Sequence, residues 1–226
     1  MRREEADLMR DWVRDLHLPR GSVCLNIGSS TKQFREREQP HITERFIGPL
    51  EDDGLTFIHC DLKKAGGVDE AGDVFDPGFR KRLREYRANL LICSNLLEHL
   101  AEPQRFADAC GELLIDEGFA LFSVPRSYPY HPDPIDTMLR LTPDQLAAMM
   151  RDWTVVRSEE IRAGNYWRDL RESGAGWSRL IRQIVRVAIP IYRPHQWRAN
   201  ASRLLWVTRM YSVSVVLLQK PHGVGE

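Results

Sequence analysis

The stretch that decides the fold is residues 89–124, NLLICSNLLEHLAEPQRFADACGELLIDEGFALFSV. Two apolar runs, Asn89–Ser94 and Gly118–Val124, are typical of buried strands. Between them, apolar residues recur at helical spacing over the length that a crossover connection needs, at Phe106, Ala109, Leu113 and Leu114. The stretch therefore predicts a β-α-β unit with two parallel strands.

Further apolar runs on both sides extend this unit into a sheet. Strands are expected at residues 23–27, 55–60, 153–156 and 212–218. Thr142 followed by Pro143 is typical of the start of a helix. The alternation predicts an α/β fold with a doubly wound, mainly parallel sheet covered on both faces. We expect one domain over residues 1–226, with an N-terminal helix within residues 1–20.

Composition places the chain among globular proteins. It has 226 residues, 32 basic against 32 acidic side chains and 42% hydrophobic positions, which excludes disordered and fibrous classes. The four cysteines are widely spaced and form no C-x-x-C pair, which indicates buried thiols in a reduced cytoplasmic protein. No stretch approaches the roughly 18 apolar residues of a membrane span.

One segment breaks the charge balance. From Ser173 to Gln219 there are seven arginines and no lysine or acid. We expect a basic amphipathic helical insertion over residues 164–210, before the last strand. Its predicted apolar face comprises Trp177, Leu180, Ile181, Ile184, Val185, Ala188 and Ile191, opposite Arg179, Arg182 and Arg186, with Pro190 ending the helix.

Two interpretations of this segment remain open. Residues 177–209 could contact an anionic membrane, with the protein peripheral to its inner face, or cover a lipid-linked acceptor. Alternatively the helix packs against its own sheet or against a second subunit in a homodimer.

Polar residues follow the first strands, at the edge where ligands of such sheets bind. The turn Gly28–Thr31 consists of small residues that let a ligand approach the backbone. Asp61 ends the second strand and is suited to ribose hydroxyls, and Asp73 is suited to an adenine amino group. The turn lacks the further glycines of G-x-G-x-x-G, and no P-loop sequence occurs. These features indicate a nucleoside site without phosphates and disfavour a nicotinamide oxidoreductase.

After the fifth strand, residues 125–136 form a loop stiffened by four prolines. Four of its polar residues are candidates to bind an acceptor: Arg126, Tyr128, Tyr130 and Asp136. His131 is the candidate general base, with Asp133 or Asp136 orienting its ring. His99, which follows Glu98 after the fourth strand, is the competing candidate.

Other kinds of site find no support in the sequence. The seven histidines show no zinc-ligand spacing, so no metal site is predicted. An N-P-P-Y type of motif is absent after the fourth strand, and we expect no nucleic-acid partner.

Five segments in this order resemble class I S-adenosylmethionine-dependent methyltransferases, in particular the small bacterial branch associated with glycan and natural-product modification. They are LNIGSST (25–31), HCDL (59–62), GDVFDP (72–77), ICSNLLEHL (92–100) and SVPRSYPYHPDPIDTMLRLTPDQL (123–146). The resemblance covers about residues 23–150 and the final strand, and implies a Rossmann-like fold with S-adenosylmethionine as cofactor.

The resemblance also implies roles for individual residues. The turn Asn26, Gly28, Ser29 and Ser30 would hold the methionine part of the cofactor, and Asp61 the ribose. Asp73 with Val74 would meet the adenine edge, while Ser94 and Asn95 would border the sulfonium. Asn26 and Ser30 stand where an acidic residue and a second glycine are commonest in the family.

The expected function is methyl transfer to a small-molecule, sugar or lipid-linked acceptor, most simply at a hydroxyl. The alternative, motivated by Asn26 and Ser30, is a methyltransferase-like scaffold or partner subunit that performs no chemistry.

Overall fold

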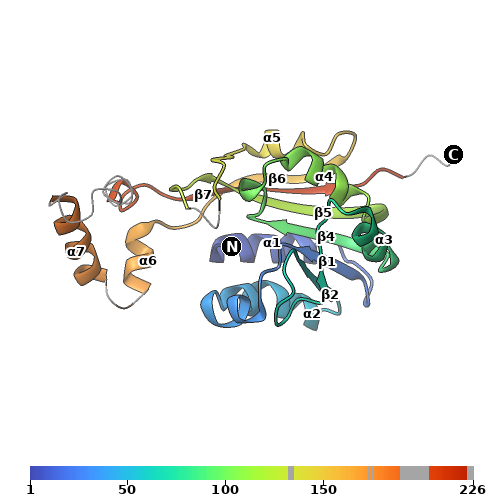
Figure 1. The fold of residues 1–226 in the computed structure, drawn as a ribbon, viewed down its shortest axis with the longest axis horizontal. Helices are drawn as coiled ribbons and strands as arrows, with labels where there is room; N and C mark the ends of the chain where they lie inside the picture. The colour runs from blue at the N-terminus through green and yellow to red at the C-terminus, as the bar shows by residue number, and fades with distance from the viewer. Residues whose placement is uncertain (132–134, 173, 175, 189–203, 223–226) are drawn as a thin grey trace.

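The computed structural model describes residues 1–131, 135–172, 174, 176–188 and 204–222 (Figure 1). Its strands are β1 (Val23–Ile27), β2 (Thr56–Asp61), β3 (Glu70–Ala71), β4 (Ala88–Ser94), β5 (Leu114–Ser127), β6 (Thr154–Arg162) and β7 (Ser212–Gln219). Its α-helices are α1 (Arg3–Arg14), α2 (Gly48–Asp52), α3 (Pro77–Glu85), α4 (Pro103–Gly111), α5 (Pro143–Ala147), α6 (Tyr166–Glu172) and α7 (Gly176–Ala188). Three shorter helical turns complete this set: η1 (Phe34–Glu38), η2 (Thr43–Ile47) and η3 (Leu97–His99).

The strands that the structure describes form one sheet in the order β3-β2-β1-β4-β5-β7-β6. Strands β1 to β5 pair in parallel, whereas β7 runs antiparallel to both β5 and β6. The strand order reverses between β1 and β4, and ligands of open α/β sheets bind at such a point, outside the carboxyl ends of the strands. The predicted doubly wound, mainly parallel sheet is confirmed.

Alternating strand residues send their side chains into two cores, one on each face of the sheet. On one face, Leu91 and Phe122 pack with helices α3, α4 and α5. On the other, Leu90 and Leu121 pack with α1, η2 and α2. Both faces of the central sheet are therefore covered, which explains why β1, β4, β7 and the second half of β5 are near-continuous apolar runs, whereas the edge strand β6 is exposed and charged. The four cysteines are free and buried, as expected.

Two local predictions have different outcomes. Thr142 caps α5: its hydroxyl accepts from the backbone N–H of Gln145, and the Gln145 side chain accepts from that of Thr142. The assignment of Leu113 and Leu114 to the preceding helix is wrong, because α4 ends at Gly111 and β5 begins at Leu114. Both leucines are buried, so their spacing indicated burial and not helix.

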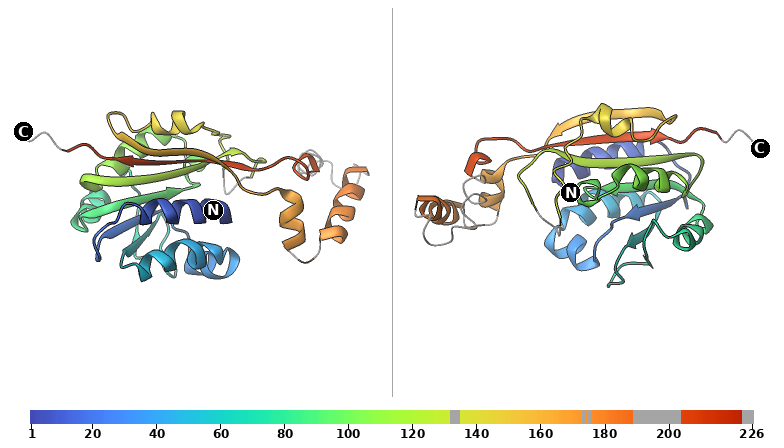
Figure 2. Two further views of the ribbon diagram at one scale, coloured as in Figure 1. Left: turned by 180° about the vertical axis from the view of Figure 1, so that it is seen from behind. Right: turned by 45° about the horizontal axis from the view of Figure 1, so that its top comes forward.

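Helices α6 and α7 form a pair beyond the carboxyl edge of the sheet (Figures 1 and 2). On α7, Trp177 is 70% exposed, and Ile181, Ile184 and Val185 are exposed as well. The predicted contributions of Pro190 and Ile191 to this helix lie outside the described residues. Within the described ranges, every helix is too short or too polar to cross a membrane.

Candidate active site

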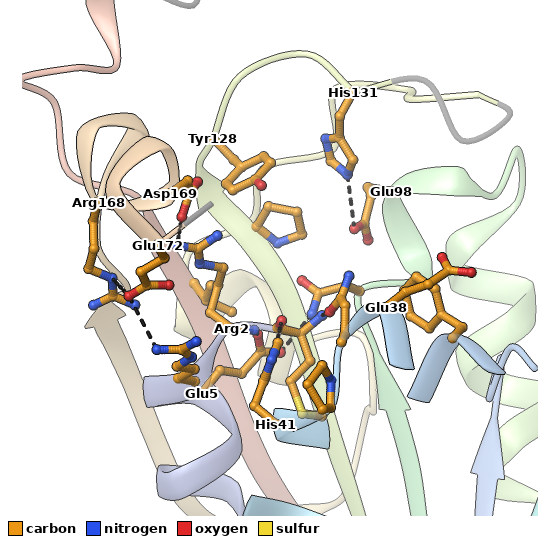
Figure 3. A pocket seen from close by; sticks show the side chains of 18 of the residues that line it. Arg2, Glu5, Glu38, His41, Glu98, Tyr128, His131, Arg168, Asp169 and Glu172 are labelled. Carbon is orange, nitrogen blue, oxygen red and sulfur yellow. Dashed lines mark hydrogen bonds and ion pairs between the residues drawn. The ribbon is translucent and has the colours of Figure 1, made fainter. Parts of the chain in front are cut away.

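A cavity of about 420 Å³ opens at the carboxyl edge of the parallel strands (Figure 3). Its walls come from the start of α1, the η1 region, the residues after β4, the end of β5 with its following loop, and α6. Its polar lining residues include Arg2, Arg3, Glu5, Asn95, Glu98, His99, Tyr128, His131, Arg168, Asp169 and Glu172. The cavity therefore combines segments from both ends of the sequence.

Glu5 joins helix α1 to the carboxyl ends of β4 and β5. Its side chain is fully buried, and Oε1 accepts hydrogen bonds from Ser94 Oγ at 3.1 Å, Asn95 Nδ2 at 2.7 Å and Ser123 Oγ at 2.5 Å. Oε2 accepts from the backbone N–H of Arg2 at 2.8 Å. A buried carboxylate is stable only with partners of this kind, so Glu5 fixes the floor of the cavity.

Ion pairs connect the start of α1 to α6 and form one side of the cavity. Arg2 donates to Asp169 at 2.5 Å, and Arg168 forms two hydrogen bonds with Glu4. Arg3 lies 3.2 Å from Glu172. This network places α6 at the mouth of the cavity.

The opposite wall carries a cluster of Glu98, His99 and His131. Glu98 Oε1 lies 3.7 Å from His99 Nε2 and 3.9 Å from His131 Nε2, and the two imidazole rings are 5.3 Å apart between centroids (Figure 3). The Glu98 side chain is fully buried, and burial raises its pKa to about 7. Burial also lowers the pKa of His131, against the opposing effects of Pro129 and Asp136. Near neutral pH the His131 ring is therefore uncharged.

Asp136 holds the loop that carries His131. It forms an ion pair with Arg140 at 2.7 Å and accepts from the backbone N–H groups of His131 and Met138 at 3.1 and 2.8 Å. Burial alone would raise the pKa of the Asp136 carboxyl, but these donors outweigh it and hold the pKa below its usual range. Thr137 anchors the loop to the backbone oxygen of Glu98 through its N–H at 2.8 Å and its hydroxyl at 3.0 Å.

The turn after β1 lies beside the end of β2, as the predicted cofactor site requires. Gly28 has φ +74°, and a Cβ there would lie 2.8 Å from the Leu96 side chain. Ser29 is buried, and Ser30, at φ +56°, donates its N–H to Asp61 Oδ2 at 2.9 Å. Asp61 Oδ1 accepts one longer bond, at 3.3 Å, from Lys63. Because a carboxylate has about four acceptor positions, Asp61 retains capacity for ribose hydroxyls.

Arg35 stabilises this turn through hydrogen bonds to its backbone. It is 4% exposed and donates to the backbone oxygens of Ser29, Ser30 and Gly67 at 3.0, 2.6 and 2.7 Å. The sequence does not single out Arg35, because nothing distinguishes it within the mixed charges of its segment.

Asn26 contacts a histidine on the neighbouring strand. Its side-chain Nδ2 lies 3.1 Å from His59 Nδ1, and the two residues are paired across β1 and β2. The pKa of His59 is lowered to about 4 by burial and by the charge of Arg35. Asn26 therefore contacts a His59 ring that is neutral near pH 7.

The two residues expected at the adenine edge differ in their surroundings. Asp73 Oδ1 accepts from the backbone N–H of Phe75 at 2.8 Å, which stabilises the turn before α3. Val74 is 6% exposed and belongs to the core. In this structure Asp73 therefore has a structural partner, and the backbone oxygen of Val74 accepts from Arg80 at 2.9 Å.

The structure brings four of the predicted site residues to the cavity: Asn95, His99, Tyr128 and His131. The three other residues predicted to bind an acceptor do not line it. Arg126 donates to the backbone oxygen of Arg140 at 2.9 Å, and Tyr130 is 56% exposed. Asp136 accepts from the backbone N–H of His131 and so stabilises the loop. Ser94 does not line the cavity, and its hydroxyl donates to Glu5, which does. Asp133 lies outside the described residues.

Other cavity residues were not predicted from the sequence. The sequence does not indicate the charged residues of α1 and α6 at the cavity, because they resemble the ordinary charges of amphipathic helices. These residues are Arg2, Glu5, Arg168 and Asp169. Glu98 was noticed only as the neighbour of His99, and its complete burial depends on contacts that distant segments provide.

The comparisons with known proteins identify the fold. No family model and no curated protein matches the chain. The [4+2]-cyclase SpnF has a similar structure, with a TM-score of 0.52 at 15% identity over 96% of this chain and 81% of its own. Coclaurine N-methyltransferase bound to N-methylheliamine and S-adenosylhomocysteine has a TM-score of 0.53 at 11% identity, over 96% of this chain and 70% of its own.

The chain thus has the Rossmann-like fold of class I S-adenosylmethionine-dependent methyltransferases, and the fold that the sequence resemblance implied is confirmed. The carboxyl edge of this fold carries the turn after β1, bonded to Asp61, and the polar cavity.

Proposed function

We propose that the chain binds S-adenosylmethionine and transfers its methyl group to a hydroxyl of an acceptor held in the 420 Å³ cavity. The observation that carries this proposal is the position of the Glu98, His99 and His131 cluster beside Asn95, at the carboxyl end of β4. Polar groups able to take up a proton therefore lie at the edge where this class of sheet binds its ligands.

The cofactor end is assigned to the turn after β1 and to Asp61. Gly28 and Ser30 have positive φ, so this turn has a left-handed backbone, and Asp61 ends β2 with unused acceptor capacity. The proposed cofactor site also includes Asn26, Ser29, Asp73, Val74 and Ser94. Asn95 would lie between the cofactor and the cavity.

At the acceptor end, the chain has to align the hydroxyl, exclude water and take up one proton. When bound, S-adenosylmethionine supplies a methyl group that leaves a neutral thioether, so alignment matters more than help to the leaving group. As the new carbon–oxygen bond forms and the carbon–sulfur bond breaks, the hydroxyl proton passes to the cluster. His131 is the preferred base, because its ring is neutral and its Nε2 faces the cavity cluster.

The acceptor is proposed to be a small molecule, a sugar or a lipid-linked compound. The cavity is large enough for one sugar-sized group, and its ion-paired wall suits a polar ligand. Arg179, Arg182 and Arg186 line a second cavity of about 230 Å³ with Tyr166 and Gln183, and could meet the phosphate of a lipid-linked acceptor or an anionic membrane. Homodimer formation stays a prediction.

A second candidate is a scaffold of this fold without methyltransferase chemistry. Two observations favour it: Asn26 and Ser30 replace the commonest cofactor-binding residues, and a structurally similar protein is a cyclase. Turnover separates the two candidates.

The experiment is incubation of the purified protein with S-[methyl-³H]adenosylmethionine and fractions of a cell extract, followed by separation of the labelled products. The proposal predicts label in one acceptor fraction, in an alkali-stable ether linkage. The His131→Ala variant should lose this label, and the distant surface variant His222→Ala should retain it. Binding of the cofactor with no label in any fraction would favour the scaffold.

A further inference from the structure

Three side chains of the cavity place potential metal ligands close together. One nitrogen from each of His99 and His131 and one oxygen from Glu98 all lie within 4.8 Å of one another. Separations of 3.7 and 3.9 Å from the Glu98 oxygen to the two Nε2 atoms are too long for hydrogen bonds. They are close to the roughly 3.4 Å between ligands that metal–ligand bonds of about 2.0–2.2 Å give in a tetrahedral site.

The two imidazoles are oriented as metal ligands usually are. His131 Nδ1 lies 3.2 Å from the backbone oxygen of Pro129, and His99 Nδ1 contacts the backbone oxygen of Ile135. A carbonyl oxygen can only accept, so each ring carries its hydrogen on Nδ1 and leaves a lone pair on Nε2. Metal-binding histidines typically donate their second nitrogen to a carbonyl in this way, which fixes the tautomer and the ring.

Glu98 supplies an independent observation. Its side chain is fully buried, and within the described residues neither carboxylate oxygen has a hydrogen-bond partner. Native structures seldom leave a buried carboxylate without partners, because the desolvation cost is high. A cation between Glu98 and the two histidines would remove this cost.

We infer that Glu98, His99 and His131 bind a divalent transition-metal ion such as Zn²⁺ or Mn²⁺. Two imidazoles and one carboxylate suit these ions better than Mg²⁺ or Ca²⁺, which prefer oxygen ligands. Three protein ligands leave coordination positions open toward the cavity, as in catalytic metal sites. Histidine spacing in the sequence could not show this site, because residue 131 comes from a different loop.

The catalytic part of this inference rests on the proposed function. The ion would bind the acceptor hydroxyl and lower its pKa, so that the proton can leave to solvent. With both Nε2 atoms bound to the ion, His131 is a ligand, and the role of His131 as base applies to the metal-free protein. Expansion from four to five ligands would open a second position and favour an acceptor with neighbouring hydroxyls, such as a sugar diol.

Metal binding is tested by calorimetry of chelator-treated protein with Zn²⁺ and by the visible absorption spectrum with Co²⁺, neither of which requires methyl transfer. The wild type should bind one ion. His99→Ala, His131→Ala and Glu98→Gln should each weaken binding by at least about 10- to 100-fold, the loss typical even of groups one step removed from a metal. The exposed His222→Ala is the control and should bind as the wild type does.

Equal Zn²⁺ affinity in wild type and in all three cluster variants would overturn the metal site, as would the absence of binding at millimolar Zn²⁺. If Glu98→Gln keeps the Tm and the S-adenosylhomocysteine affinity of the wild type, its weaker metal binding is caused by the missing ligand and not by unfolding. Metal binding without methyl transfer would contradict the proposed function and leave the metal site standing. Methyl transfer unaffected by a chelator would overturn the catalytic role of the ion and return the base to His131.

Discussion

The two ends of the site are held together by different kinds of interaction. Around Asp61 the donors are backbone N–H groups, that of Ser30 in the turn after β1 and that of Lys63 after β2. Around Glu5 and Glu98 the contacts are mainly between side chains, and both carboxyl groups are fully buried. The first end is held by backbone donors at the ends of two paired strands, whereas the second depends on carboxyl groups that the complete fold buries.

Loss of His131 should have the largest effect. His131→Ala removes either the proposed base or a metal ligand, so turnover should fall by about 10²–10⁴-fold while S-adenosylhomocysteine affinity stays nearly unchanged. His131→Gln should not restore activity, because an amide cannot take the proton. Steady-state kinetics and calorimetry measure the two quantities.

The competing base gives the matched comparison. If His131→Ala retains most of the activity and His99→Ala loses it, His99 is the general base. Retention by both variants would mean that alignment alone drives the transfer.

Glu5→Ala should lower the stability of the fold by about 3 kcal/mol, because it leaves buried donors of Ser94, Asn95 and Ser123 without their acceptor. Glu5→Gln keeps an acceptor oxygen and should cost less. Urea unfolding measures both, with the exposed Asp11→Ala as the control. A loss as small as that of the control would show that Glu5 does not join α1 to the sheet.

At the other end, Asp61→Ala should weaken S-adenosylhomocysteine binding about ten-fold or more, since a charge-assisted hydrogen bond contributes roughly 1.5–3 kcal/mol. Asp61→Asn keeps an acceptor for Ser30 and separates loss of charge from distortion of the turn. Calorimetry measures the affinity, and the exposed Asp116→Ala is the control. Equal binding by wild type and Asp61→Ala would remove Asp61 from the site.

The buried carboxyl of Glu98 makes stability depend on pH. Its pKa is raised from 4.5 to about 7, so the folded state holds a proton that the unfolded state has lost. The free energy of unfolding of the metal-free protein should therefore fall as pH rises from 5 to 7.5, by about 2 kcal/mol from this group.

Glu98→Gln isolates this contribution, because the lowered pKa of His131 acts in the opposite direction in both proteins. Urea unfolding at several pH values should show a weaker fall in the variant. The same pH dependence in both would mean that the Glu98 pKa is not raised.

The smallest effect concerns the arginines of α7. If the segment meets an anionic membrane, the protein should sediment with phosphatidylserine vesicles at low salt, each arginine contributing about 1 kcal/mol. Arg182→Ala should then lower vesicle affinity about five-fold, and physiological salt should weaken it further. Vesicles of phosphatidylcholine are the control. No association at low salt would favour packing of this segment within the protein or between subunits.

The sequence predicted the part of the molecule that local chemistry determines. Apolar runs identified the main strands, Thr142 identified a helix start, and small residues with Asp61 identified the first two strand ends. Strand β3, with two residues, is too short to give a periodic pattern.

The cavity could not be predicted in the same way. Glu5 is one of several acids in a helix of mixed charge, and only its position against β4 and β5 distinguishes it. Likewise, Glu98 and His131 are 33 positions apart, and the bonds of Asp136 and Thr137 bring them together. Burial created by tertiary contacts turns these ordinary residues into a site.

A crystal structure of the protein with S-adenosylhomocysteine tests the central claim most directly. We expect the ribose hydroxyls on Asp61 and the sulfur beside Asn95, facing the cavity lined by Glu98, His99 and His131. A ligand bound away from Asp61, or with its sulfur directed away from that cavity, would contradict it.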